Sequence, residues 1–298
     1  MPSNEYRAFM AAMKGTLVDA EDSLEVARTK LEAMHGHPVE PTTRIEWLES
    51  PPIRRAFIEA EEAHGCERIL VLFHGGAFIA AAGNGYVFYA EMLSKYCGAR
   101  VLLVDYRLAP EHRFPAALDD CVAAYLDLIS TGVVPSQVGF IGDSCGGGLA
   151  LAALLRLRDQ GSPLPACAIT LGGWLDLEAR GESAVAPLGP EPFAHRDFIR
   201  ARARDYLGPD GDLRDPFASP IGCDPTGFPP ILLQVGQVDL CRDDALNFAR
   251  TAALAGVDVT TEVYPEMVHG FQGLASAGIP EGISALQRAG SFLSRLIP

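Results

Sequence analysis

The sequence predicts an α/β protein with a mostly parallel sheet that helices cover on both faces. Short apolar runs at 68–73 (RILVLF), 138–141 (VGFI) and 230–235 (PILLQV) are typical of strands buried on both sides. Segments with helical apolar spacing separate such runs, for example at 85–97 and 115–129. Repeated strand–helix–strand units join parallel strands and place helices on both faces of a sheet.

The elements follow one another along the chain with few interruptions. Near the N-terminus, helical spacing gives one apolar face with Phe9, Met10 and Met13, and another with Leu24, Ala27 and Leu31. A Gly- and Pro-containing segment (HGHPVEPTT) then ends the helices. The expected strands are 43–47, 55–60, 68–73, 101–104, 138–141, 166–171, 230–235 and 257–264, and a last amphipathic helix covers 281–296.

One interval departs from this alternation. Residues 175–228 contain Pro- and Gly-rich turns and a short helical pattern at 194–206, without a strong strand. Long connections of this kind are often functional. We therefore expect a single domain over 1–298, in which residues 1–40 form an N-terminal helical cap and 175–228 a cap insertion above the sheet.

Composition limits the classes of partner and compartment. Acidic residues outnumber basic ones by 38 to 24, a formal charge of −14, which disfavours binding to nucleic acid. The start (MPSNEYRAFMAAMKG) lacks the apolar core of a secretory leader, and no apolar stretch has the length of a membrane span. Seven cysteines without CxxC spacing indicate reduced thiols in a cytoplasmic protein and no zinc site.

A candidate nucleophile lies in the segment Gly142-Asp143-Ser144-Cys145-Gly146, which fits the pattern G-x-S-x-G. The strand-like VGFI precedes it, and the helix-forming GLALAALLRLRDQ follows it. A strand, a sharp turn and a helix are the context that a nucleophile elbow requires. Ser144 would then lie at a helix N-terminus, where the helix dipole favours developing negative charge.

The candidate base and acid are expected after Ser144 in the order acid, then histidine. Of the two later histidines, His195 falls in the insertion, whereas His269 lies in a loop just past the last strand. We therefore predict His269 as general base. The acid should follow the preceding strand, which favours Asp239. Asp243 and Asp244 are competitors, but they lie where capping and first-turn charge of the next helix explain them.

A glycine-containing loop follows the strand at 68–73. The segment 74–78 (HGGAF) fits the HGGG-type loop, whose backbone N–H groups stabilise an oxyanion. The expected donors are the N–H groups of Gly75, Gly76, Ala77 and Cys145. We interpret His74 as structural, fixing the loop through hydrogen bonds.

Several separated blocks together resemble one family. They are HGGAF (74–78), YRLAPEHRFPAALDD (106–120), GDSCGG (142–147), the pair Asp239 and Asp243, and HGF (269–271). In this order they resemble the bacterial hormone-sensitive-lipase-like esterases, and the subgroup with epsilon-lactone hydrolases and short-chain carboxylesterases looks most similar. The resemblance implies an α/β-hydrolase fold with an eight-stranded sheet and a helical cap, no cofactor, and frequent homodimers.

The resemblance also implies an activity. It is the hydrolysis of small-molecule carboxylic esters, of short to medium acyl chain, through Ser144, His269 and Asp239 and an acyl-enzyme. The cap and insertion are expected to shape the acyl pocket, with Phe9, Met13, Phe78 and Trp174 as candidate lining residues. The charged residues of the YRLAPEH block are assigned to the scaffold.

Two positions depart from the family pattern. Ala77 replaces the usual third glycine, which narrows the loop and would limit bulky alcohols or tertiary esters. Cys145 replaces the usual alanine after the serine, and a thiol at a helix N-terminus can be acidified. We therefore hypothesise that activity is sensitive to alkylation at Cys145.

Other activities remain open at this stage. An amidase, a deacetylase or a lactone hydrolase would use the same three residues. A non-catalytic ligand receptor on this scaffold is disfavoured, because such receptors lose at least one of the three. A metal hydrolase lacks ligand clusters with suitable spacing.

Overall fold

The computed structural model describes residues 1–298 except 14–16, 35–36, 51–52 and 82. In this part of the chain the strands form one eight-stranded sheet in the order β1-β2-β4-β3-β5-β6-β7-β8. The strands are β1 (Arg44–Ser50), β2 (Ile53–Glu59), β3 (Ile69–Phe73), β4 (Arg100–Asp105), β5 (Val138–Asp143), β6 (Cys167–Leu171), β7 (Ile231–Gly236) and β8 (Val259–Tyr264). β2 pairs antiparallel with β1 and β4, and every other pairing is parallel. The predicted fold class is therefore confirmed.

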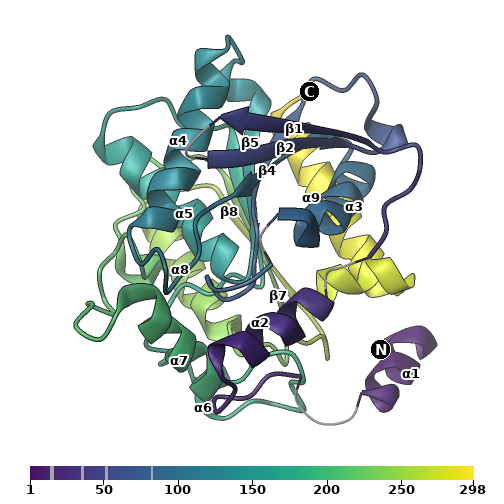
Figure 1. The fold of residues 1–298 in the computed structure, drawn as a ribbon, viewed down its shortest axis with the longest axis vertical. Coiled ribbons are helices and arrows are strands. Elements are labelled where there is room, and N and C mark those ends of the chain that lie inside the picture. The colour runs from purple at the N-terminus through teal and green to yellow at the C-terminus, as the bar shows by residue number, and fades with distance from the viewer. Residues whose placement is uncertain (14–16, 35–36, 51–52, 82) are drawn as a thin grey trace.

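Helices cover both faces of this sheet (Figure 1). The α-helices are α1 (Asn4–Ala12), α2 (Leu24–Ala33), α3 (Val87–Cys97), α4 (Ala116–Ser130), α5 (Cys145–Asp159), α6 (Glu182–Val185), α7 (Arg196–Leu207), α8 (Arg242–Leu254) and α9 (Pro280–Leu296). Short 3-10 turns are η1 (Glu61–Ala63), η2 (Gly83–Tyr86), η3 (Pro135–Gln137), η4 (Pro220–Gly222) and η5 (Phe271–Ala277). α3 and α9 pack on one face, whereas α4, α5 and α8 lie on the other (Figure 1).

The middle of the sheet forms the core. Every side chain of β3, β5 and β7 is buried. These are the three strands that continuous apolar runs predict, because a strand covered on both faces has no polar side to present to water. The loops at their carboxyl ends are therefore held by a rigid frame.

The N-terminal helices and the insertion are found toward one end of the molecule, where Figure 1 shows α2, α6 and α7, with α1 apart from them at the same end. Ser3 caps α1 and also donates from its hydroxyl to Glu281 of α9 at 2.9 Å. Arg28 of α2 forms an ion pair with Glu111 and donates to the carbonyl of Ala109. In the described part of the chain, none of the helices combines the length and apolar character that crossing a bilayer requires.

Candidate active site

Ser144 occupies a strained turn between β5 and α5. Its φ of 51° and ψ of −122° are unusual for a residue with a Cβ, and such conformations cost about 1–3 kcal/mol. A Cβ on Gly142 would lie 2.1 Å from the carbonyl oxygen of Gly146, and a Cβ on Gly146 would lie 1.9 Å from that of Phe73. Only glycines allow β3, β5 and α5 to approach this closely, so the sequence pattern produces the turn that projects the serine.

The structure brings Ser144, His269 and Asp239 into one hydrogen-bonded line. Ser144 Oγ lies 2.9 Å from His269 Nε2, and His269 Nδ1 lies 2.9 Å from Asp239 Oδ1. The three residues follow β5, β8 and β7, whose parallel carboxyl ends meet at one edge of the sheet. Asp239 is fully buried, and its Oδ1 also accepts the N–H of Cys241 at 2.8 Å, which fixes the carboxylate.

The electrostatic surroundings of His269 favour its charged form. Burial opposes the imidazolium, but the charge and hydrogen bond of Asp239, followed by Glu191 and Asp143, outweigh it and raise the pKa of His269 to about 9. The imidazole thus lies where a positive charge that develops by proton uptake is stabilised.

The loop after β3 turns back beside Ser144 with three successive positive φ values. They are 99° at Gly76, 54° at Ala77 and 64° at Phe78. Gly76 and Ala77 line the same cavity as Ser144. We expected the N–H of Gly75 to be one of the donors to an oxyanion. Instead it donates to Asp143 Oδ1 at 2.9 Å and is not directed at a ligand.

His74 stabilises this loop through contacts with Tyr106 and with the backbone of Gly75. Its ring stacks on Tyr106 with centroids 4.0 Å apart, and its Nδ1 lies 2.7 Å from the carbonyl oxygen of Gly75. Tyr106 in turn donates from its hydroxyl to the carbonyl of His74 at 2.7 Å. These contacts agree with the structural interpretation of His74. Arg107, from the same block as Tyr106, donates three hydrogen bonds to the Asp120 carboxylate, one from its backbone N–H and two from its guanidinium.

Cys145 does not have the environment expected of a reactive thiol. It is fully buried, and its Sγ accepts the N–H of Phe78 at 3.3 Å. Burial raises the pKa of the Cys145 thiol to about 12, because the interior disfavours the thiolate. The expectation of an acidified thiol is therefore contradicted: the helix N-terminus is present, but desolvation exceeds its effect. Whether alkylation at Cys145 affects activity stays a prediction to be tested.

A mostly apolar cavity of about 420 Å³ opens onto Ser144 and His269. Of the predicted lining residues, Phe9, Met13 and Trp174 line it. Phe78 does not, because its ring stacks on Tyr206 with centroids 3.8 Å apart. Sequence reasoning missed several further lining residues, including Tyr89 and Met92 of α3, Phe193, Phe198 and Ile199 of the insertion, and Leu274 of η5.

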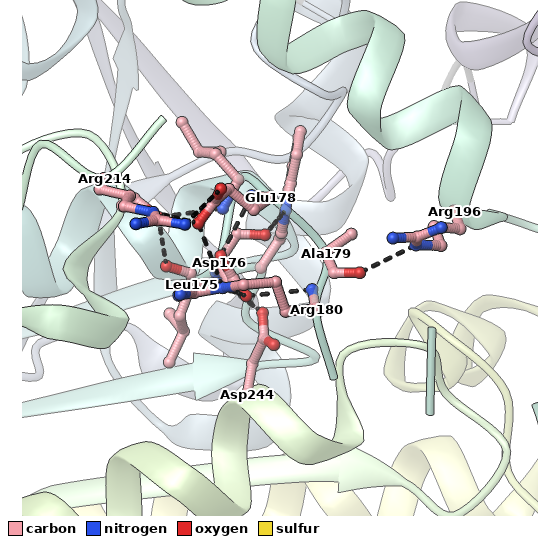
Figure 2. Close-up of polar contacts among 11 residues, drawn as sticks. Leu175, Asp176, Glu178, Ala179, Arg180, Arg196, Arg214 and Asp244 are labelled. Carbon is pink, nitrogen blue, oxygen red and sulfur yellow. Dashed lines mark hydrogen bonds and ion pairs between the residues drawn. The ribbon is translucent and has the colours of Figure 1, made fainter. Parts of the chain in front are cut away.

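Asp243 and Asp244, the two alternatives to Asp239 as the acid, bind backbone groups of the insertion. Asp244, buried in the first turn of α8, accepts the N–H groups of Leu175 and Asp176 at 2.9 Å each (Figure 2). Asp243 accepts the N–H of Ser183 at 2.9 Å. Their first-turn position is as expected, but capping does not explain them, because both carboxylates bind backbone outside their own helix.

The network around Asp176 extends this anchor toward the surface. Its carboxylate accepts from Arg180, and Glu178 forms ion pairs with Arg180 and Arg214 (Figure 2). The other competitor for the base, His195, caps α7 by accepting the N–H of Phe198. It thus has a structural contact within the insertion.

Glu191 is a site residue that the sequence analysis missed. It lies in the insertion, and its Oε2 accepts the backbone N–H of His269 at 2.6 Å. No motif surrounds it in the sequence, and 78 positions separate the two residues. Only the folded chain shows that they meet.

One group of side chains in the described part of the chain has the proximity of metal ligands. Asp239, Cys241 and His269 offer atoms within 4.8 Å of one another. The Cys241 pKa is raised well above its ordinary value, first by burial and then by Asp239. Asp239 meets His269 at Nδ1, so a metal held by this group would displace the Asp239–His269 hydrogen bond, and the donor set fits proton transfer better than metal binding.

Comparison with known proteins identifies the family. Residues 70–273 match a family described as alpha/beta hydrolase fold. The chain belongs to this family. An acetyl-hydrolase of Streptomyces hygroscopicus is 41% identical over 226 residues, covering 76% of this chain and 75% of that protein. An esterase of Acinetobacter venetianus is 33% identical over 262 residues, covering 87% and 84%.

Solved structures agree with this assignment. An esterase from the bacterial hormone-sensitive lipase family superimposes with a TM-score of 0.88 at 34% identity, covering 100% of both chains. An esterase/lipase from an uncultured bacterium gives a TM-score of 0.90 at 30% identity, covering 99% of both. The predicted fold, family and enzyme class, a carboxylic-ester hydrolase, are confirmed by these matches.

Proposed function

We propose that this hydrolase cleaves small-molecule carboxylic esters of short to medium acyl chain through Ser144, His269 and Asp239. The observation that carries the proposal is the unbroken line from Ser144 Oγ through both His269 nitrogens to Asp239 Oδ1, with 2.9 Å at each step. This is the arrangement that activates a serine hydroxyl toward an acyl carbon.

Each residue has a definite role in this proposal. His269 accepts the hydroxyl proton as Ser144 Oγ attacks the ester carbonyl, and Asp239 stabilises the resulting imidazolium. The imidazolium then protonates the leaving alcohol, which gives an acyl-enzyme. Water, deprotonated by His269, then attacks the acyl carbon, and the bond between the acyl carbon and Ser144 Oγ breaks. Oγ takes the proton back from His269, and the carboxylic acid is released.

Backbone N–H groups would stabilise the tetrahedral oxyanion. We assign this role to Gly76 and Ala77, which line the cavity, and to Cys145, the first residue of α5. The first N–H groups of a helix have no partner within that helix, so they are available to an anion. Removing one such donor typically costs about 3–4 kcal/mol of barrier stabilisation.

The cavity supports the proposed range of acyl chains. Its wall is mainly apolar and its volume is about 420 Å³. Each buried methylene contributes about 0.8 kcal/mol, so affinity should increase with chain length until the cavity is filled. The same wall offers few polar groups for a charged or heavily hydroxylated substrate.

The test is to assay the wild type, Ser144→Ala and Ser130→Ala on p-nitrophenyl esters of increasing acyl length. Ser130 is exposed on α4 and provides a matched control. We expect turnover of short esters in the wild type and control, and none in Ser144→Ala. A lactone and an anilide are tested alongside. Faster turnover of the lactone would replace open-chain esters by cyclic ones, and faster turnover of the anilide would replace the ester assignment by an amidase. Full activity in Ser144→Ala would refute the proposed nucleophile.

A further inference from the structure

Glu191 connects the insertion to the loop that carries His269. The carboxylate is buried, with 9% of the residue exposed, and it uses its two oxygens on different segments. Oε2 accepts the backbone N–H of His269 at 2.6 Å, and Oε1 accepts that of Phe193 at 3.0 Å. Hydrogen bonds to an ionised acceptor are about twice as strong as neutral ones. A single side chain therefore joins the base to a residue that lines the cavity.

The segment next to Glu191 also contacts the N-terminal helices. The ring of Phe193 stacks on Phe9 of α1, with centroids 6.4 Å apart and 18° between the planes. The carbonyl of Pro192 accepts the N–H of Leu17 at 2.7 Å. The position of His269 is thus connected, through Glu191, to both segments that cover the cavity.

We propose, on the basis of the proposed function, that Glu191 is a positioning residue for the reaction. It holds the main chain of His269 so that Nε2 meets Ser144 Oγ, and it places a second negative charge beside the imidazole. Seating of the insertion over the cavity and alignment of the base then depend on the same carboxylate.

The charges around Glu191 are consistent with this role. Burial and the charge of Asp239 raise the pKa of Glu191 to about 7, although His269 and the hydrogen bonds lower it. Tyr6 of α1 and Cys241 also lie near it: burial and then the Glu191 charge raise the pKa of Tyr6, and burial, Asp239, Asp244 and then Glu191 raise the pKa of Cys241. Two buried carboxylates near one another are costly unless a cation compensates them. The imidazolium that His269 forms on accepting a proton would supply that cation.

The test compares Glu191→Gln and Glu191→Asp with the wild type, and Glu182→Gln serves as a matched control. Glu182 is exposed on α6 of the same insertion. On an ester that the wild type hydrolyses, kcat and KM are measured across pH. The fall of kcat/KM on the acidic side of the pH profile, where His269 takes up a proton, is called the acid limb. For Glu191→Gln we expect the acid limb to move about one pH unit to lower pH. The plateau of kcat should fall about tenfold, with a smaller change in KM.

The Glu191→Asp variant separates the effect of the negative charge from the effect of side-chain length. Glu191→Asp keeps the charge but is one methylene shorter, so it should retain the acid limb and still lose kcat. Glu182→Gln should match the wild type in both. Thermal unfolding establishes that each variant is folded, and if Glu191→Gln does not fold, Glu191→Asp carries the test.

Two results would overturn the proposal. One is wild-type kcat in Glu191→Gln or Glu191→Asp. The other is a reduced kcat in Glu191→Gln with an unmoved acid limb, which would indicate support of the fold alone. Failure of the proposed function is distinct, because it would appear as an inactive wild type or an active Ser144→Ala.

Discussion

The N–H of Gly75 donates to Asp143 Oδ1 at 2.9 Å, which ties the 74–78 loop to the residue before the proposed nucleophile. The other carboxylate oxygen accepts from the hydroxyl of Tyr86 at 2.8 Å. A Cβ on Gly75 would lie 2.4 Å from the same carboxylate, so only glycine allows this approach. The distance between the loop and Ser144 is therefore set by Asp143 rather than by the loop alone.

Removing the Asp143 carboxylate should loosen this loop. In Asp143→Ala we expect kcat to fall about 10- to 100-fold, because small displacements of catalytic groups have effects of this size. KM should change less. Asp143→Asn retains an oxygen for Gly75 and should lose less activity. Steady-state kinetics on one ester tests this, and an unchanged kcat in Asp143→Ala would show that the loop is held by other contacts.

Ala77 should limit the alcohol side of the substrate. Ala77 lines the cavity beside Ser144, and its φ of 54° is a backbone conformation that favours glycine. In Ala77→Gly we expect turnover of esters of tertiary alcohols to increase relative to turnover of p-nitrophenyl acetate. The ratio of kcat/KM for the two substrates measures this effect. An unchanged ratio would mean that another part of the wall excludes bulky alcohols.

Cys145 should not react with alkylating agents in the folded protein. Its thiol is fully buried with a pKa of about 12, so little thiolate is accessible. After treatment with iodoacetamide we expect full activity, and mass mapping should place modification first at the partly exposed Cys66. Cys145→Ala should respond in the same way. Inactivation of the wild type but not of this variant would restore the original hypothesis.

The sequence predicted the features that local chemistry determines. The turn around Ser144 requires glycine at fixed offsets, and a buried strand reads as a continuous apolar run. The order of Ser144, Asp239 and His269 along the chain then selected the side chains that the structure brings within hydrogen-bonding distance.

Contacts between distant segments could not be predicted in this way. Gly75 and Asp143 are 68 positions apart, and Glu191 and His269 are 78 apart. Neither pair leaves a periodic or spaced signal. Burial of Cys145 likewise depends on packing of the 74–78 loop against α5, so only its helix position was visible in the sequence. The predicted set of residues lining the cavity was incomplete for the same reason, because α3, η5 and the insertion also contribute to the cavity wall.

Activity should increase with pH into the alkaline range. The reaction needs neutral His269, and Asp239, Glu191 and Asp143 together raise its pKa to about 9 against the effect of burial. Below this value each pH unit should lower kcat/KM about tenfold. Among these carboxylates, Asp239 raises the pKa of His269 most. Asp239→Asn should therefore move the acid limb to lower pH while reducing kcat. A wild-type limb near the ordinary histidine pKa would contradict this expectation.

Asp244 should be replaceable by asparagine but not by alanine. Both backbone N–H groups that it binds, those of Leu175 and Asp176, reach the same oxygen, which an amide can supply. In Asp244→Ala two buried donors lose their acceptor, and we expect unfolding free energy to fall by about 2–4 kcal/mol. Urea unfolding measures both variants, and Asp210→Asn, at an exposed position, is the control.

The same aspartate should also make stability depend on pH. Burial raises the pKa of Asp244 from 3.8 to about 8, although its two N–H bonds lower it. Between these values the folded protein retains a proton that the unfolded chain has released, so this contribution to stability is present below the unfolded pKa and is lost as pH rises through about 8. Asp244→Asn does not titrate, so its stability relative to the wild type should increase from pH 5 to pH 9. Parallel pH curves for the two proteins would show that Asp244 is ionised throughout.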